Sequence, residues 1–264
     1  MLAENFTFTQ QTLQDYVDCP YRFYLHEIKR LEWPALESEP VREQEALMLL
    51  GTRFHLLCQQ YLSGVPVNLL NGQVTDPQLD IWWKNFLDIK IKPSSSDQAV
   101  ERLYSIPLAG FRLSAKFDLV VRSGSGEVVI YDWKTSQHQP KRQTILGRMQ
   151  SKVYPLMVML AKVFQPAVPE AVRMIYWYPA FPQTPIEFQY SSSLLEADRS
   201  DIEALIERID NTPDNGFKKT DNEKTCKYCR YRSFCDRGSA AGIIDAEFDA
   251  DEFSNAFDLD FDAL

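Results

Sequence analysis

The sequence lacks the features of a membrane or secreted protein. No apolar run approaches the roughly 20 residues that a membrane-spanning helix needs, and residues 1–10 lack the basic and apolar regions of a signal peptide. We therefore expect a cytoplasmic protein that makes no contact with a membrane. In that compartment, cysteines are more often metal ligands or catalytic groups than disulfide partners.

Basic residues are fewer than acidic ones: the chain has 28 lysines and arginines, 37 aspartates and glutamates, and a formal net charge of −9. The excess lies in residues 245–264, which contain eight acids and no base. The rest of the chain is nearly neutral, which neither favours nor excludes nucleic-acid binding, since such binding needs only a local basic groove. Phenylalanines alternate with the acids in this tail. We expect either a disordered, solubilising segment or a peptide that docks on a partner or in the protein's own groove.

A content of 45% hydrophobic and 12% aromatic residues is sufficient for a packed core. Hydrophobic periodicity predicts helices over residues 9–24, 41–62, 77–89, 143–164 and 194–209. Pro20 interrupts the first pattern, so Cys19 is expected at or near the end of that helix. Alternation of β-branched and aromatic residues predicts strands over residues 99–107, 111–122, 127–133, 172–178 and 186–190. The predicted fold class is α/β or α+β, with a central sheet flanked by helices. The expected units are a helical N-terminal lobe, a core, a cysteine segment and a disordered tail, over residues 1–98, 99–212, 213–240 and 241–264.

Two of the predicted strands carry carboxylates and are joined by a hairpin. Asp118 lies on the first strand, and Asp132 and Lys134 lie on the second, after a Ser-Gly-Ser-Gly turn. Because side chains alternate along a strand, Asp132 and Lys134 share a face that Asp118 can reach. Two such carboxylates suit Mg²⁺ or Mn²⁺, and a lysine beside them can orient water or neutralise charge at phosphorus. Asp-x-Lys by itself is a weak signal, because the same pattern is common on solvent-facing strands.

The helix predicted after these strands adds Gln150 and Tyr154, four residues apart and therefore on one face. Together, this order of residues resembles the PD-(D/E)XK nucleases, particularly their RecB-like branch. The resemblance implies a restriction-endonuclease-like core with a mixed sheet and a divalent-cation site that includes the backbone carbonyl of Trp133. It also implies a catalytic set, namely Asp118, Asp132, Lys134, Gln150 and Tyr154.

Gly51 and His55 form a Gly-x-x-x-His pattern on the second predicted helix. A lone histidine between apolar neighbours is more often a packed core residue than a metal ligand. The RecB-like branch and the related CRISPR-associated iron–sulfur nucleases carry this spacing, so the resemblance implies that His55 is a further ligand of Mg²⁺ or Mn²⁺. His26 and His138 match no such pattern and are predicted to be surface residues.

Four of the five cysteines form a second candidate site. Cys226, Cys229 and Cys235 have the spacing C-x2-C-x5-C, and Cys19 lies more than two hundred residues earlier. This spacing alone does not distinguish zinc from an iron–sulfur cluster. In the AddB-like and CRISPR-associated relatives one cysteine precedes the nuclease core and three follow it, so the resemblance implies a [4Fe–4S] cluster of structural role. Cys58 has no counterpart in that pattern and is predicted to be a buried residue that packs in the core.

The resemblance as a whole implies a metal-dependent DNA nuclease, more specifically an exonuclease acting on single-stranded ends in recombination, repair or CRISPR adaptation. A helicase or CRISPR integrase is an expected partner, because the chain has no Gly-x-x-x-x-Gly-Lys motif of its own for unwinding. Two alternatives are a non-catalytic iron–sulfur module that binds DNA ends and a zinc-stabilised interaction protein. Basic residues near the predicted site could follow the DNA backbone, namely Lys116, Arg122, Lys141, Arg142 and Arg148.

Overall fold

The computed structural model describes residues 2–32, 39–92, 96–136, 138–227 and 229–238, with the backbone alone for residues 39–45. The predicted disordered tail, residues 241–264, lies outside these ranges. In the described part of the chain, no helix is long and apolar enough to cross a membrane.

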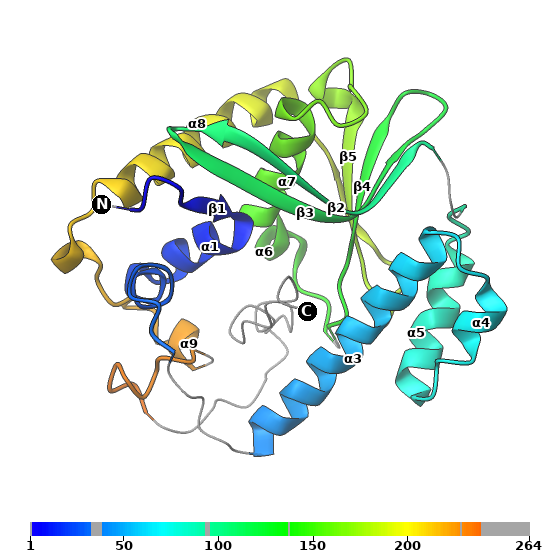
Figure 1. The fold of residues 1–264 in the computed structure, drawn as a ribbon, viewed down its shortest axis with the longest axis horizontal. Helices are drawn as coiled ribbons and strands as arrows, with labels where there is room; N and C mark the ends of the chain where they lie inside the picture. The colour runs from blue at the N-terminus through cyan, green and yellow to red at the C-terminus, as the bar shows by residue number, and fades with distance from the viewer. Residues whose placement is uncertain (1, 33–38, 93–95, 137, 228, 239–264) are drawn as a thin grey trace.

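A mixed sheet forms the centre of the described structure (Figure 1). The strand order is β1-β3-β4-β5-β6, and β2 pairs with the other edge of β3. The β1–β3 and β4–β5 pairs are parallel and the others are antiparallel. This arrangement confirms the predicted fold class. The strands are β1 (Thr7–Thr9), β2 (Gln98–Leu108), β3 (Phe111–Arg122), β4 (Val128–Trp133), β5 (Val172–Trp177) and β6 (Ile186–Gln189).

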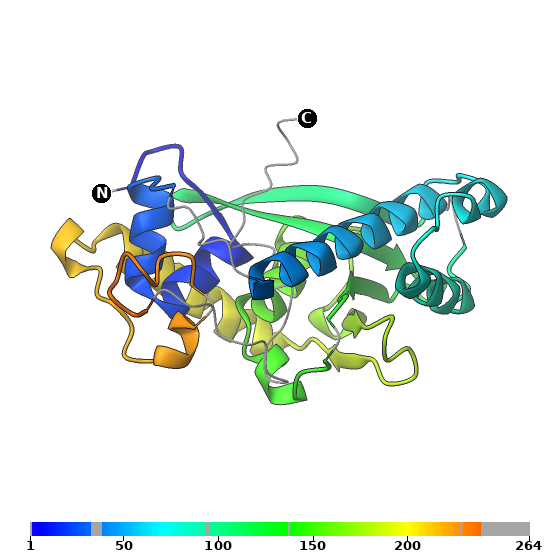
Figure 2. The same ribbon diagram turned by 90° about the horizontal axis from the view of Figure 1, so that it is seen from below.

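Helices cover both faces of this sheet, and each face has its own apolar core (Figures 1 and 2). The first core contains residues of three helices, α1 (Gln10–Asp18), α7 (Met149–Leu160) and α8 (Ser192–Asp210). The second is rich in tryptophan and contains residues of α3 (Glu39–Leu62), α4 (Val67–Asn71) and α5 (Pro77–Asp88). Shorter elements are α2 (Pro20–Phe23), a π-helix (Tyr24–Ile28), α6 (Arg142–Leu146), α9 (Glu223–Cys226) and two 3₁₀ turns, Pro169–Ala171 and Asp214–Gly216.

Side-chain caps mark the first residue of helices α1, α5, α8 and α9. The Thr9 side chain accepts a hydrogen bond from the Thr12 amide at the start of α1, and Asp76 caps α5. The helix predicted over residues 9–24 is divided at Cys19, as the interruption by Pro20 indicated, and Pro20 begins α2. The single helix predicted over residues 143–164 is wrong. The extended backbone of Arg148 separates α6 from α7.

The elements that were not predicted include the three-residue strand β1, the short helices α4 and α9, the π-helix and the two 3₁₀ turns. β1 pairs with β3, and α1 contacts α7, so the first residues of the chain pack with the central sheet. The sequence had assigned them to a helical N-terminal lobe.

Helix α3 lies very close to the chain that follows β4. Gly51 is buried there, and a Cβ atom added to it would lie 2.6 Å from Oγ1 of Thr135. Real Cβ atoms do not approach other heavy atoms this closely, so the contact requires glycine. The glycine therefore sets how near α3, and His55 one turn later, comes to the end of β4.

We predict that Gly51→Ala lowers the free energy of unfolding. Overpacking costs about 1–3 kcal/mol, and the higher helix propensity of alanine returns about 1 kcal/mol. In a Thr135→Ala background the clash is gone, and the same substitution is then expected to stabilise the protein by up to about 1 kcal/mol. Urea unfolding of the four proteins measures this coupling, and equal effects of Gly51→Ala in both backgrounds would contradict it.

Candidate active site

The candidate site lies at a gap between two strands along one edge of β3. Strand β2 occupies the other edge, while β1 pairs with Arg112–Ser114 and β4 pairs with Leu119–Arg122. The stretch between these two pairings ends at Asp118. Between the β1 and β4 pairings, this edge of β3 has no strand beside it. The backbone groups and side chains there can therefore contribute to a binding site.

Asp118 is held by groups from two other elements. One carboxylate oxygen accepts a hydrogen bond from the Trp133 amide at 2.8 Å, and the other lies 3.4 Å from Nδ1 of His55 on α3. Burial by itself would raise the pKa of Asp118. The His55 imidazole, the Trp133 amide and the charge of Lys134 outweigh burial and hold this pKa below its ordinary value.

Asp132 is almost fully buried, with 3% of its surface exposed. One carboxylate oxygen lies 3.0 Å from Nζ of Lys134, and the other accepts a 2.6 Å hydrogen bond from the Gln150 amide on α7. Burial raises the pKa of Asp132 to about 6, the Asp118 carboxylate adds to this, and the Lys134 ammonium opposes it. The predicted pair of carboxylates, the lysine and Gln150 therefore lie together in one group, in which Asp132 and Lys134 are buried and Asp118 and Gln150 are partly exposed.

Tyr154 lies next to this group but contacts the backbone. Its hydroxyl donates a 2.7 Å hydrogen bond to the carbonyl of Lys116, within the stretch of β3 that lies between the β1 and β4 pairings. Burial, together with the charges of Asp132 and Asp118, raises the pKa of the Tyr154 phenol well above its ordinary value, so the phenol stays protonated. In this structure, Tyr154 therefore supports the shape of β3 two residues before Asp118.

Glu101 belongs to the site and was missed from the sequence. Leu119 pairs with Val100 and Phe117 with Arg102, so Glu101 on β2 faces Asp118 between these pairs. Potential ligand atoms of His55, Glu101 and Asp118 all lie within 4.8 Å of one another. No local motif marks Glu101, since its position follows from strand register alone. Oxygen ligands and a histidine in this arrangement suit a divalent cation.

The basic residues expected along the DNA backbone differ in their surroundings. Lys116 lies 3.2 Å from Glu101, and Lys141 is exposed. Arg122 pairs with Asp97 at the far end of β3, and Arg142 donates to the Glu187 carbonyl at 2.9 Å. Arg148 is half-buried at the start of α7. Lys116 is the one next to the carboxylate group.

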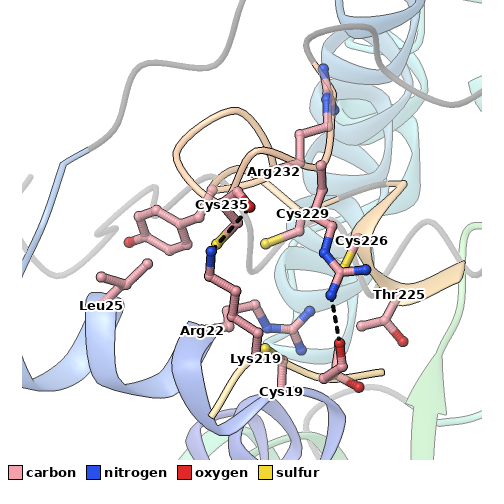
Figure 3. A pocket seen from close by; sticks show the side chains of 12 residues that line it. Cys19, Arg22, Leu25, Lys219, Thr225, Cys226, Cys229, Arg232 and Cys235 are labelled. Carbon is pink, nitrogen blue, oxygen red and sulfur yellow. Dashed lines mark hydrogen bonds between the residues drawn. The ribbon is translucent and has the colours of Figure 1, made fainter. Parts of the chain in front are cut away.

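The four predicted cysteine ligands line a single pocket, shown in Figure 3. Cys19 comes from the junction of α1 and α2, and the other three come from α9 and the turns after it. The remaining cysteine, Cys58, is buried in the second core, as the sequence predicted. Further hydrogen bonds join the same two segments. Tyr231 donates to the Leu31 carbonyl at 2.8 Å, and the Tyr21 amide donates to Lys218 at 3.1 Å.

The chemistry of this pocket fits a thiolate-bound metal centre. Burial raises the pKa of Cys229 to about 11, and it also raises the pKa of Cys226 and Cys235. Thiolates here would need the positive charge of a metal to form at neutral pH. The lining also includes four basic side chains, which would offset the negative charge of a thiolate-bound centre, namely Arg22, Lys219, Arg232 and Arg237.

Comparison with known proteins identifies the family of this chain. Among curated proteins the sequence has no significant match. The solved structures that are similar to it include the following two. One, "Crystal structure of SSO0001", is 15% identical, with a TM-score of 0.41 over 89% of this chain and 87% of that one. The other, from Eubacterium rectale and named "Putative exonuclease", is 11% identical, with a TM-score of 0.48 over 81% and 83%. The PD-(D/E)XK nuclease superfamily matches residues 7–236, nearly all of the described chain, and the protein belongs to that superfamily.

Proposed function

We propose that the protein is a divalent-cation-dependent deoxyribonuclease that degrades single-stranded DNA from an end. The observation that carries this proposal is the group of Asp118, Asp132 and Lys134, with Gln150 and His55 in contact with its carboxylates. Family membership supports nuclease chemistry and the use of a divalent metal. The preference for single-stranded ends rests on the resemblance to the RecB-like branch.

Each residue of the site has its own role in the proposed hydrolysis of DNA. Asp118, Asp132, His55 and the Trp133 carbonyl would hold Mg²⁺ or Mn²⁺, which supplies Lewis-acid stabilisation of charge at the phosphodiester. Lys134, aligned by Asp132 at 3.0 Å, is placed to orient the attacking water. Gln150 fixes the Asp132 carboxylate by its 2.6 Å hydrogen bond. Tyr154 fixes the backbone before Asp118, and Lys116 and Lys141 are exposed cations for DNA phosphates.

The first prediction concerns cleavage of end-labelled single-stranded DNA with Mn²⁺ or Mg²⁺. Asp132→Ala and Lys134→Ala are each expected to lower the rate by on the order of 10²–10³-fold or more, since each removes charge from the reacting centre. Asp80 and Lys84 form an exposed ion pair of the same two residue types on α5. Asp80→Ala and Lys84→Ala are therefore matched controls that should keep wild-type rates.

Circular single-stranded DNA tests the requirement for an end. We expect it to survive under conditions that degrade the linear form, and the labelled end then reports the polarity. Equal cleavage of circular DNA would contradict exonuclease action. A wild-type protein that binds DNA ends but cuts neither form would instead favour the non-catalytic end-binding module.

We also propose that Cys19, Cys226, Cys229 and Cys235 hold a [4Fe–4S] cluster of structural role. Support for this proposal comes from the pocket that the four cysteines line together, and from the resemblance to the AddB-like and CRISPR-associated relatives. Zinc bound by the same four thiolates is the alternative.

Iron analysis of anaerobically purified protein tests this second proposal. We expect about four irons per chain and visible absorbance near 400 nm. Cys19→Ala should lose both signals and lower the melting temperature, because the link between the chain ends is lost. Cys58→Ala, in the apolar core, should keep both signals. Bound zinc in place of iron, or a Cys19→Ala protein with full iron content, would contradict the assignment.

The biological setting that we propose is recombination, repair or CRISPR adaptation. A helicase or integrase partner, and docking through the acidic tail, would be consistent with each of these. The cleavage polarity and the partner recovered with the protein would distinguish them.

A further inference from the structure

Glu101 occupies an unusual backbone position for a strand residue. Its φ angle is +48°, in the left-handed region that disfavours side chains other than those of glycine, asparagine and aspartate. The irregularity occurs opposite Asp118, in a β2–β3 pairing that keeps one register on both sides. The Glu101 carboxylate lies close to Asp118 and His55. Residues held in such conformations are concentrated at functional sites.

The electrostatic surroundings of Glu101 are also unfavourable without a cation. Its side chain is only 14% exposed, and the facing residue, Asp118, is another acid. The side chains that favour its charge are the His55 imidazole and Lys116, which lies at 3.2 Å and is itself 58% exposed. An exposed partner such as Lys116 contributes little, and His55 is shared with Asp118. Two carboxylates brought together in a largely buried place repel each other unless positive charge lies between them.

We propose that Glu101 is a ligand of the divalent cation, which it holds together with His55 and Asp118. Ligand atoms around one Mg²⁺ at about 2.1 Å lie up to about 4.2 Å apart, and the three side chains have ligand atoms within 4.8 Å of one another. Small side-chain rotations therefore suffice to bring them onto one ion. This inference rests on the proposed function, because it adds a residue to the metal site of the same nuclease.

The alternative is that Glu101 only forms an ion pair with Lys116 and His55. The two readings differ in metal affinity. A ligand contributes directly to cation binding, whereas an ion-pair partner can be neutralised with little effect on it. Metal affinity is therefore the quantity to measure, in the absence of DNA.

Electron paramagnetic resonance titration of Mn²⁺ into the full-length protein makes this measurement. We expect Glu101→Gln to weaken Mn²⁺ binding at least tenfold relative to wild type. Glu127→Gln is a matched control, because Glu127 is a partly exposed glutamate paired with Arg173 at 3.2 Å on the same sheet. It should bind Mn²⁺ as wild type does. Glu101→Asn removes the same charge with a residue that tolerates positive φ, so it serves if the glutamine variant melts early in EDTA.

Wild-type Mn²⁺ affinity in Glu101→Gln or Glu101→Asn would overturn the assignment. Two further outcomes separate it from the nuclease proposal. If wild type cuts DNA, Asp118→Asn does not, and Glu101→Gln binds Mn²⁺ normally, the nuclease stands and Glu101 is no ligand. If Mn²⁺ affinity depends on Glu101 but wild type cuts no DNA, the ligand assignment stands and the nuclease function is overturned.

Discussion

Two acidic side chains, Asp118 and Asp132, are brought together on neighbouring strands in a place with little access to water. Buried carboxylates need positive charge and hydrogen-bond donors close by. Three parts of the chain meet that need: the end of β4 with the Trp133 amide and Lys134, α3 with His55, and α7 with Gln150. The close approach of α3 at Gly51 follows from the same requirement, because it brings His55 to Asp118.

The second constraint is the closure of the chain near its two ends. The segment around Cys19 and the segment after α9 lie beside each other in both ribbon views and share the pocket of four cysteines (Figures 1 and 2). Arg22 connects this pocket to α1, because its guanidinium lies 2.9 Å from both Asp15 and Asp18. Since α1 packs against α7, which carries Gln150, the pocket and the carboxylate group are connected through one continuous core.

Sequence patterns predicted the bounds of helices and strands correctly where those bounds depend on local signals. β3 has its predicted bounds, because alternation and the following turn are both local, and helices α3, α5 and α8 begin and end within two residues of prediction. Features that depend on pairing between distant segments were missed. β1 has only three residues and is a strand because it pairs with β3. Glu101 enters the site through strand register, and the contact of Tyr154 with a backbone carbonyl follows from the gap between β1 and β4.

The central claim is that the buried carboxylates are arranged to hold a divalent cation. Thermal unfolding of wild type and Asp118→Asn, each in EDTA and in saturating Mg²⁺, tests it without reference to DNA cleavage. A ligand at about 100 times its dissociation constant stabilises the folded state by about 2.7 kcal/mol. The account predicts that Mg²⁺ raises the unfolding temperature of wild type by several degrees and leaves that of Asp118→Asn nearly unchanged. An equal rise in both proteins, or no rise in wild type, would contradict it.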